Sequence, residues 1–345
     1  MPNVQEPLTL ETESNLPQLN GDQLRANGQL SWKVENADAS LHEHEYDPNF
    51  TQHVIDAMGP GTSPRMRKVM ASLITHVHDF ARENKVTVEE WMAGVNFLNE
   101  AGRMSTDVRN EGQLVTGVIG LESLVDEITY KLASSAEDAP TATAILGPFH
   151  IKNAPKLDMG SSIFDDFPNS DTTYLYGTVT DYITGKPIAG AELDVWQAAP
   201  NGLYGQQDPN QAKYNLRGRF TTSEDGHYNF YCLHPTSYPI PSDGPAGRLL
   251  DLMDRHHMRP GHIHFIVSAK DYLPVTTQIF DRNDKYLSND SVFAVKDSLV
   301  VDFLPRMGDL KAKFELQYNF RLATLEEANK NSVLGTTEES AGNSL

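Results

Sequence analysis

The spacing of apolar positions along the 345-residue chain changes from a helical to a strand-like pattern. Residues about 48 to 135 show apolar side chains three and four positions apart, which indicates amphipathic helices. Ser63 and Pro64 have the residue types preferred at an N-cap and at the first helical position. Thr87 and Glu90 form a capping-box pattern ahead of a second helix, and a third is predicted from Leu121 to Leu132.

Strand-like runs follow in the second half of the chain. They read "TTYLYGTVTD", "AELDVWQAA", "HYNFYCL", "GHIHFIVSA", "VTTQIFD" and "SLVVDFL", with Gly, Pro, Asn and Asp between them. We therefore predict an α+β fold, with an N-terminal helical segment packed on a C-terminal mixed β-sandwich. The expected parts are a flexible arm (1–47), a helical dimerisation and linker domain (48–135), a catalytic β-sandwich domain (136–322) and a disordered tail (323–345).

Composition narrows the classes of function. The net charge of -19 argues against nucleic-acid binding, for which basic patches are needed. A single cysteine, Cys232, excludes an internal disulfide framework and a cysteine-rich zinc site. The sequence shows no apolar run long enough to span a membrane, and its first thirty residues lack a secretory signal pattern. A cytoplasmic protein is expected.

The run "HHMRPGHIHF", residues 256–265, contains four of the twelve histidines. On a strand, His262 and His264 share one face, with their Cβ atoms about 7 Å apart. Ile263 and Phe265 then face the opposite side. Two imidazoles could then bind one metal ion. The same pattern also suits two histidines with purely structural roles, so spacing alone leaves both interpretations open.

Further ligands have to come from elsewhere in the chain. Tyr204 follows an Asn-Gly turn in "APNGLYGQQD", and Tyr238 lies among prolines in "TSYPIPSDGPAG". A loop tyrosine is usually a packing residue. A site built from imidazole and phenolate would favour Fe(III), because phenolate is a hard, anionic oxygen donor. The two-histidine, one-carboxylate set of Fe(II) oxygenases fits poorly, because the second position is His264 rather than an acid.

These motifs together carry a family resemblance. In order and spacing, "NGLY", "NLRGRFTT", "YPIPSDGP", "RHHMRPGHIHF" and "TTQIFD" resemble the intradiol ring-cleavage dioxygenases. The similarity is to the catechol 1,2-dioxygenase and hydroxyquinol 1,2-dioxygenase branch, fungal type. It runs from about residue 63 to 305 and includes "EEWMAGVNFLNEAGRM" and "LGPFHIKNAP".

The resemblance implies a non-heme Fe(III) cofactor held by four side chains, Tyr204, Tyr238, His262 and His264, with solvent hydroxide as a fifth ligand. It implies that Tyr238 also acts in catalysis by leaving the metal when substrate binds. Arg259 matches the family's active-site arginine, and Gln278 matches a polar residue beside the iron. The implied reaction cleaves an aromatic 1,2-diol with O2, converting catechol to cis,cis-muconate or hydroxyquinol to maleylacetate with both oxygen atoms incorporated.

A substrate pocket is expected where the helical segment meets the sheet. The candidate lining residues are Leu73, Val77, Asp79, Ile240 and Phe293. Asp79 could accept a hydrogen bond from a third hydroxyl and so favour hydroxyquinol, provided that it faces the pocket. The resemblance also implies a homodimer joined through the N-terminal helices, with a phospholipid bound at that interface.

Two other functions compete with this interpretation. A β-sandwich of the same fold could be a non-catalytic binding module. A zinc hydrolase could use His262 and His264, but the sequence offers no obvious third nitrogen or carboxylate ligand near them, and the two tyrosines would have no role.

Overall fold

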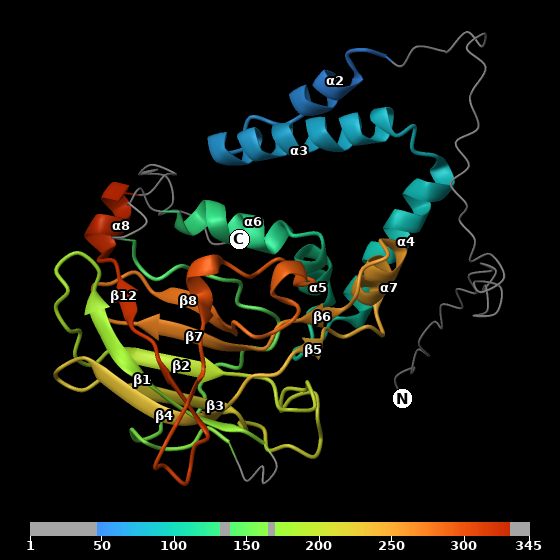
Figure 1. The fold of residues 1–345 in the computed structure, drawn as a ribbon. Helices are drawn as coiled ribbons and strands as arrows, with labels where there is room; N and C mark the ends of the chain where they lie inside the picture. The colour runs from blue at the N-terminus through green and yellow to red at the C-terminus, as the bar shows by residue number, and fades with distance from the viewer. Residues whose placement is uncertain (1–46, 132–138, 165–169, 332–345) are drawn as a thin grey trace, which may run out of the picture. The chain divides into compact units, whose positions relative to one another are not determined.

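The computed structural model describes residues 47–131, 139–164 and 170–331. By internal contacts the chain divides into two units, residues 1–86 and residues 87–345. Figure 1 shows the described helices and strands as a ribbon that is coloured from the N-terminus to the C-terminus. The predicted arm lies outside the described residues except for Asp47, and so does the tail from residue 332 onward.

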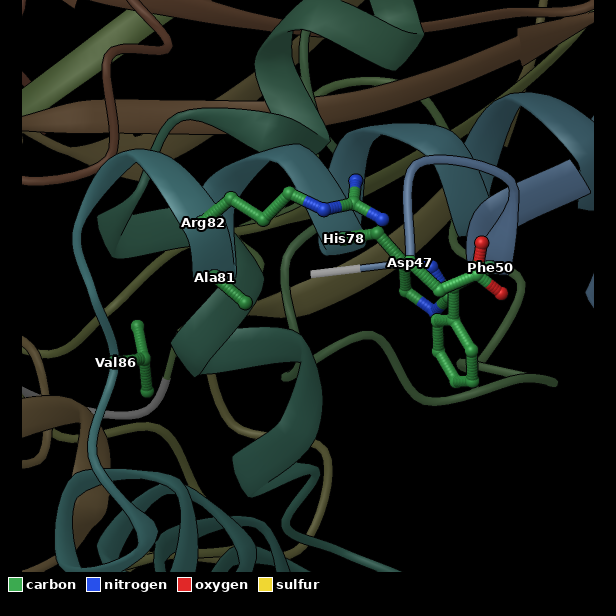
Figure 2. Close-up of a pocket in the computed structure, with 6 residues that line it drawn as sticks. All are labelled: Asp47, Phe50, His78, Ala81, Arg82 and Val86. Atoms are coloured by element: carbon green, nitrogen blue, oxygen red, sulfur yellow. The ribbon is translucent and has the colours of Figure 1, made fainter. Parts of the chain in front are cut away.

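The described part of the first unit is a pair of helices, α2 (Phe50–Asp56) and α3 (Pro64–Glu83). The predicted start of α3 is confirmed, because the Ser63 hydroxyl accepts a hydrogen bond from the Met66 amide and Pro64 opens the helix. Apolar side chains of α3 are exposed within the chain: Met66, Val69, Leu73, Val77 and Phe80. Figure 2 shows a pocket of this unit, lined by Asp47, Phe50, His78, Ala81, Arg82 and Val86.

The second unit begins with three helices, α4 (Val88–Met104), α5 (Glu111–Val118) and α6 (Leu121–Tyr130). The capping box is confirmed at α4, where Thr87 and Glu90 each bond the other's backbone amide. These helices fall in the same compact unit as the sheets, so the division by contacts comes after Val86 and not at the predicted boundary of residue 135. Among the described helices, none has the length and hydropathy needed to cross a membrane.

The first sheet is mixed and is built around β1 (Thr172–Asp181). β4 (His227–Leu233) pairs antiparallel with β1, whereas β11 (Phe314–Gln317) and β12 (Phe320–Leu322) pair with successive parts of it in parallel. β10 (Leu304–Pro305) extends the sheet beside β11.

The second sheet has the order β3-β2-β7-β8-β9. Its strands are β2 (Glu192–Trp196), β3 (Arg217–Thr221), β7 (His262–Ser268), β8 (Val275–Asp281) and β9 (Val300–Val301). Its pairs are antiparallel except β8 with β9. Two short strands, β5 (Tyr238–Pro239) and β6 (Met258–Arg259), form a separate antiparallel ribbon.

The two large sheets bury a common apolar core. Leu175 and Phe230 enter it from the first sheet, and Leu193, Ile263 and Phe265 from the second. Inner faces that interdigitate in this way define a β-sandwich. The predicted α+β class, with helices mainly toward the N-terminus and mixed sheets after them, is confirmed.

Cys232 belongs to this core and is fully buried on β4. Burial raises the pKa of its thiol, so the reactive thiolate is disfavoured in the folded protein. We expect no reaction with a thiol-specific disulfide reagent in the native state and complete labelling of this one cysteine in denaturant. Stoichiometric labelling of protein that keeps its native circular dichroism would contradict this placement.

A second apolar core lies between the helices and β8. Leu114 and Val118 of α5 pack there with Leu250 of α7 (Pro245–Leu252) and with Phe280 of β8. Ile240, two residues after Tyr238, is part of the same cluster. This core fixes the helical wall against the end of the second sheet that carries the histidine motif.

The described chain continues past residue 322, where composition predicts a disordered tail. α8 (Leu325–Asn331) follows β12, with Ala323 and Ala328 buried. Thr324 and Glu327 exchange capping hydrogen bonds at its start. The predicted boundary is corrected here, because a polar sequence that has a capping box and two small apolar contacts still forms a packed helix.

Candidate active site and metal centre

The histidine motif opens β7 as the strand pattern predicts. His262 and His264 lie on one face, with their Nε2 atoms 3.1 Å apart, while Ile263 and Phe265 enter the sandwich core. Both imidazoles are almost completely buried. His256 and His257 lie outside this pair; His257 instead bonds the Asp251 carboxylate.

Two separate loops bring the tyrosines to the same place. Tyr204 follows the predicted turn, in which the Gly202 amide donates to the Ala199 carbonyl. Gly202 has φ +81°, and an added Cβ would lie 2.9 Å from the Tyr238 Cβ, so glycine lets the two loops approach closely. Tyr238 is positioned by the β5–β6 ribbon, which pairs it directly with Arg259.

The four polar side-chain atoms converge. The Oη atoms of Tyr204 and Tyr238 are 3.0 Å apart, and Tyr238 Oη is 3.4 Å from His262 Nε2. Together with the 3.1 Å contact between the two Nε2 atoms, these distances link two oxygens and two nitrogens in one buried cluster. The structure thus brings together all four predicted ligands, from positions up to 60 residues apart in sequence (264 - 204).

The hydrogen-bond partner of His262 decides which of its ring nitrogens carries the proton. Its Nδ1 is 2.7 Å from the Pro260 carbonyl, which can only accept, so Nδ1 donates and the lone pair of the neutral ring lies on Nε2. Burial lowers the pKa of His262 and of His264 well below the ordinary value, with Arg259 lowering both further. The two rings are therefore neutral, the state that a metal ion requires.

The pKa values of the two phenols shift in the opposite direction, upward. Burial raises the pKa of Tyr204 well above its ordinary value, with a further increase from Tyr238, and burial also raises the pKa of Tyr238. The positive charge of Arg259 opposes both shifts. Without another cation both phenols keep their protons, so a metal ion in the cluster would release them.

Aromatic packing holds this donor cluster in place. Trp196 of β2 stacks on His264 with centroids 4.6 Å apart, and Phe149 stacks on Tyr204 at 4.7 Å. Arg217 lies over the Tyr204 ring and donates to the Phe149 carbonyl. Burial lowers the pKa of Arg217 to about 10. Sequence reasoning did not select these supporting residues, because aromatic residues also suit an ordinary core and nothing in the sequence shows that Arg217 is buried.

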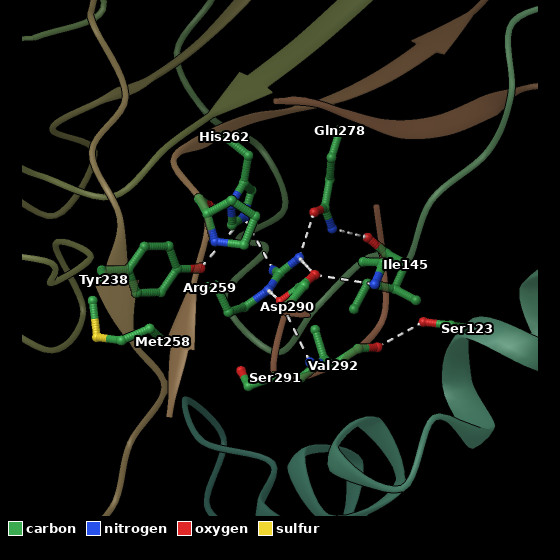
Figure 3. A network of polar contacts seen from close by, with 12 residues as sticks. Ser123, Ile145, Tyr238, Met258, Arg259, His262, Gln278, Asp290, Ser291 and Val292 are labelled. Atoms are coloured by element: carbon green, nitrogen blue, oxygen red, sulfur yellow. Dashed lines mark hydrogen bonds and ion pairs between the residues drawn. The ribbon is translucent and has the colours of Figure 1, made fainter. Parts of the chain in front are cut away.

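Arg259 is the centre of a buried polar network (Figure 3). Its Nε and one terminal nitrogen bind the two oxygens of Asp290 at 3.0 and 3.1 Å, and Gln278 Oε1 accepts from the same terminal nitrogen at 2.8 Å. The remaining nitrogen lies 3.1 Å from His262 Nε2. Burial alone lowers the pKa of Arg259, but the Asp290 carboxylate reverses that effect, so the guanidinium stays charged beside the donor cluster.

Gln278 is anchored in turn by its amide nitrogen, which donates to the Ile145 carbonyl at 2.6 Å. It pairs with His264 across β7 and β8. Asp290 also accepts from the backbone amides of Val292 and Ala294. Asp290 was not among the predicted residues: a buried arginine requires an acid, but nothing in the sequence shows which one.

A pocket reaches the cluster from the helical side. It is lined by Tyr238, Arg259 and His264 together with Gln113, Leu114, Gly117, Glu122, Ile145, Gly147, Pro148, Phe149, Ile240 and Val292. Ile240 therefore lies where it was predicted. The helical wall is formed by α5 and α6.

The other four predicted residues are not among the side chains that line this pocket. Leu73 and Val77 are on α3 of the first unit and are 52% and 53% exposed, and Asp79 pairs with Arg82. Phe293 is 54% exposed under the Arg255 guanidinium, and its neighbour Val292 lines the pocket instead. The Phe293 amide donates to the Asp290 carbonyl and closes a turn. In this turn the Val292 side chain lines the pocket, whereas the Phe293 side chain is exposed.

Comparisons with known proteins identify two matching family models and several relatives. Residues 63–137 match the family model described as catechol dioxygenase N terminus, and residues 145–324 match the one described as dioxygenase. An intradiol ring-cleavage dioxygenase of Aspergillus niger is 53% identical over 279 residues, covering 81% of this chain and 89% of that protein. The chain belongs to the intradiol ring-cleavage dioxygenase family. This dioxygenase is thus an oxidoreductase, as the sequence resemblance predicts.

Two further relatives place the dioxygenase within the family. A catechol 1,2-dioxygenase of Candida albicans is 48% identical over 282 residues, covering 80% of this chain and 92% of the relative. The crystal structure of a hydroxyquinol 1,2-dioxygenase from Pseudomonas putida superposes with a TM-score of 0.72 at 35% identity, over 80% of this chain and 97% of the other. The predicted family and branch are confirmed.

The donor cluster of this dioxygenase fits the Fe(III) that the sequence resemblance implies. Two neutral imidazoles and two phenols converge in a buried site, and His264 Nδ1 has no hydrogen-bond partner within the described ranges. Hard oxygen donors that become anionic suit Fe(III). Over the same residues there is no group of three or more His, Cys, Asp and Glu side chains placed to hold a metal ion, so a zinc site of that composition finds no support.

Proposed function

We propose that the chain is an Fe(III)-dependent dioxygenase that cleaves an aromatic 1,2-diol between its two hydroxylated carbons. The observation that carries the proposal is the convergence of Tyr204, Tyr238, His262 and His264 beside a buried, charged Arg259. The proposed reaction takes catechol to cis,cis-muconate, hydroxyquinol to maleylacetate, or both. Each incorporates both atoms of O2, so O2 is the second substrate.

Each protein residue has a separable task in this proposal. Bound ferric iron would supply Lewis acidity toward the two diol oxygens. Tyr238, as a phenolate, can accept a proton at Oη from a substrate hydroxyl. Arg259 places a permanent positive charge where negative charge develops on the ring, and Gln278 and Asp290 keep it there.

The proposal predicts a coloured iron protein. Phenolate ligation should give a burgundy chromophore with about one iron per chain, and removal of iron by a chelator should abolish both colour and O2 uptake. Incubation with catechol or hydroxyquinol in air, followed by oxygen electrode and ultraviolet absorbance, measures turnover. Protein that is reconstituted with iron, remains colourless and consumes no O2 with any diol would contradict the proposal.

The same measurements separate the alternatives. A binding module would bind diols without O2 uptake, and a zinc hydrolase would contain zinc rather than iron. No feature of the site favours either over the dioxygenase.

Two associated predictions remain part of the proposal. A homodimer is proposed because the apolar side chains of α3 are exposed within a single chain. A phospholipid at that interface is proposed on the family resemblance, and the cytoplasmic location likewise stays a prediction from the sequence.

A further inference from the structure

A carboxylate, Glu122, lines the same pocket as Tyr238, Arg259 and His264. Gln113 is its hydrogen-bond partner, donating to Oε1 at 2.7 Å. Burial raises the pKa of Glu122. Hydrogen bonding by Gln113, the charge of Arg259 and the Gly147 backbone amide offset that effect only in part. An acidic group is thus held, partly desolvated, in a pocket otherwise formed largely by apolar side chains and glycines.

Gly117 gives this carboxylate access to the pocket. It lies on α5, also lines the pocket, and has no side chain to cover Glu122. A Cβ added at Gly117 would lie 3.5 Å from Glu122 Oε2 and 3.4 Å from Val292 Cγ1, in van der Waals contact with both. A larger side chain at position 117 would therefore lie against Oε2 on the wall of the pocket.

We propose that Glu122, exposed through the gap at Gly117, is the specificity-determining residue of the pocket and selects diols that carry a further ring hydroxyl. This inference rests on the proposed diol-cleaving function. A hydroxyl donates a hydrogen bond to the carboxylate, an unsubstituted ring leaves that oxygen without the bond, and an anionic ring substituent is repelled. This inference assigns to Glu122 the role that the sequence suggested for Asp79, which pairs with Arg82 on α3.

A purely structural role has to be distinguished from this one. Glu122 lies in the first turn of α6, where a carboxylate also stabilises the helix dipole, and it fixes Gln113. A structural role predicts that a substitution lowers protein stability and changes kcat/KM by the same factor for all substrates. Selection predicts a change in the ratio of kcat/KM values between substrates.

The experiment compares hydroxyquinol, catechol and 3,4-dihydroxybenzoate on iron-loaded full-length protein. Glu122→Leu should lower the hydroxyquinol-to-catechol ratio of kcat/KM about tenfold, since a hydrogen bond to a charged acceptor is lost. Glu122→Gln should raise kcat/KM for 3,4-dihydroxybenzoate relative to catechol. Glu127→Gln, which removes the same charge from an exposed position of α6, should leave both ratios unchanged.

Gly117→Ala provides an independent arm, because its methyl group fits and shields Oε2 without removing Glu122. It should shift the hydroxyquinol-to-catechol ratio of kcat/KM in the same direction as Glu122→Leu. Anaerobic titration of the visible band with each substrate should show that the change is in substrate binding. Ratios that stay within twofold in both variants, or a wild-type preference for 3,4-dihydroxybenzoate, would overturn the inference. Absence of O2 uptake by the wild type with every diol would instead defeat the proposed function.

Discussion

Replacing Tyr204 by phenylalanine should remove iron-dependent activity while leaving the fold intact. The substitution deletes one oxygen of the donor cluster, whose hydrogen-bond contact is with the other phenol, Tyr238. Loss of one anionic ligand weakens iron binding and the polarisation of the diol. If this costs about 4 kcal/mol of transition-state stabilisation, kcat/KM falls by roughly 10³-fold. The visible band should weaken or shift.

Tyr228→Phe is the matched control for this substitution. Tyr228 is equally buried, and its hydroxyl donates to the Tyr318 carbonyl rather than to an atom of the donor cluster. Its loss should cost about 1–2 kcal/mol of unfolding free energy with iron content unchanged.

Calorimetry with and without iron separates the two effects. Iron should raise the Tm of the wild type and of Tyr228→Phe. It should raise the Tm of Tyr204→Phe far less, because the stabilisation that a ligand gives increases with its affinity. Full iron occupancy and activity in Tyr204→Phe, or equal loss of iron in both variants, would exclude Tyr204 as a ligand.

Regular parts of the site could be predicted from local pattern. Alternation along a strand is a property of the backbone, so the shared face of His262 and His264 follows from spacing alone and is confirmed. Tyr204 and Tyr238 lie in loops without periodicity, and only their resemblance to a family motif singled them out. The structure brings their oxygens to within 3.0 Å of each other.

Contacts between elements were harder to predict. An amphipathic helix shows which face is apolar but not which partner covers it. Leu73 and Val77 of α3 were predicted to line the pocket because small-molecule sites often form between two layers, and this stays a prediction. The described wall comes from Leu114 and Gly117 of α5. Asp290, which follows a short 3-10 turn, carries no sequence signal that could connect it with Arg259, 31 residues before it (290 - 259).

Breaking the buried ion pair of Arg259 and Asp290 should have the second large effect, on stability and on catalysis. We expect Asp290→Asn to lower unfolding free energy by about 3 kcal/mol, because the guanidinium loses its counter-charge in a desolvated site. The equivalent change in an exposed pair, Asp302→Asn opposite Arg282, should cost less than about 1 kcal/mol. Chemical denaturation of both variants measures the contrast.

Catalysis should suffer in Asp290→Asn without loss of the metal. Asp290 binds two nitrogens of the Arg259 guanidinium, and a guanidinium displaced by about 1 Å can cost roughly 10²-fold in rate. Since Asp290 contacts none of the four donor atoms, iron content and the phenolate band should be retained while kcat falls. Loss of iron, or kcat/KM within twofold of wild type, would contradict this positioning role.

A double-mutant cycle with Arg259→Met tests whether the two residues act as a pair. Removing Arg259 as well eliminates the uncompensated charge that Asp290→Asn leaves, so the double variant should be destabilised by less than the sum of the two single changes. Activity should not recover, because the positive charge beside the donor cluster is absent. Strict additivity in stability would show that the ion pair does not hold Arg259 in place, and Gln278 would then be its principal anchor.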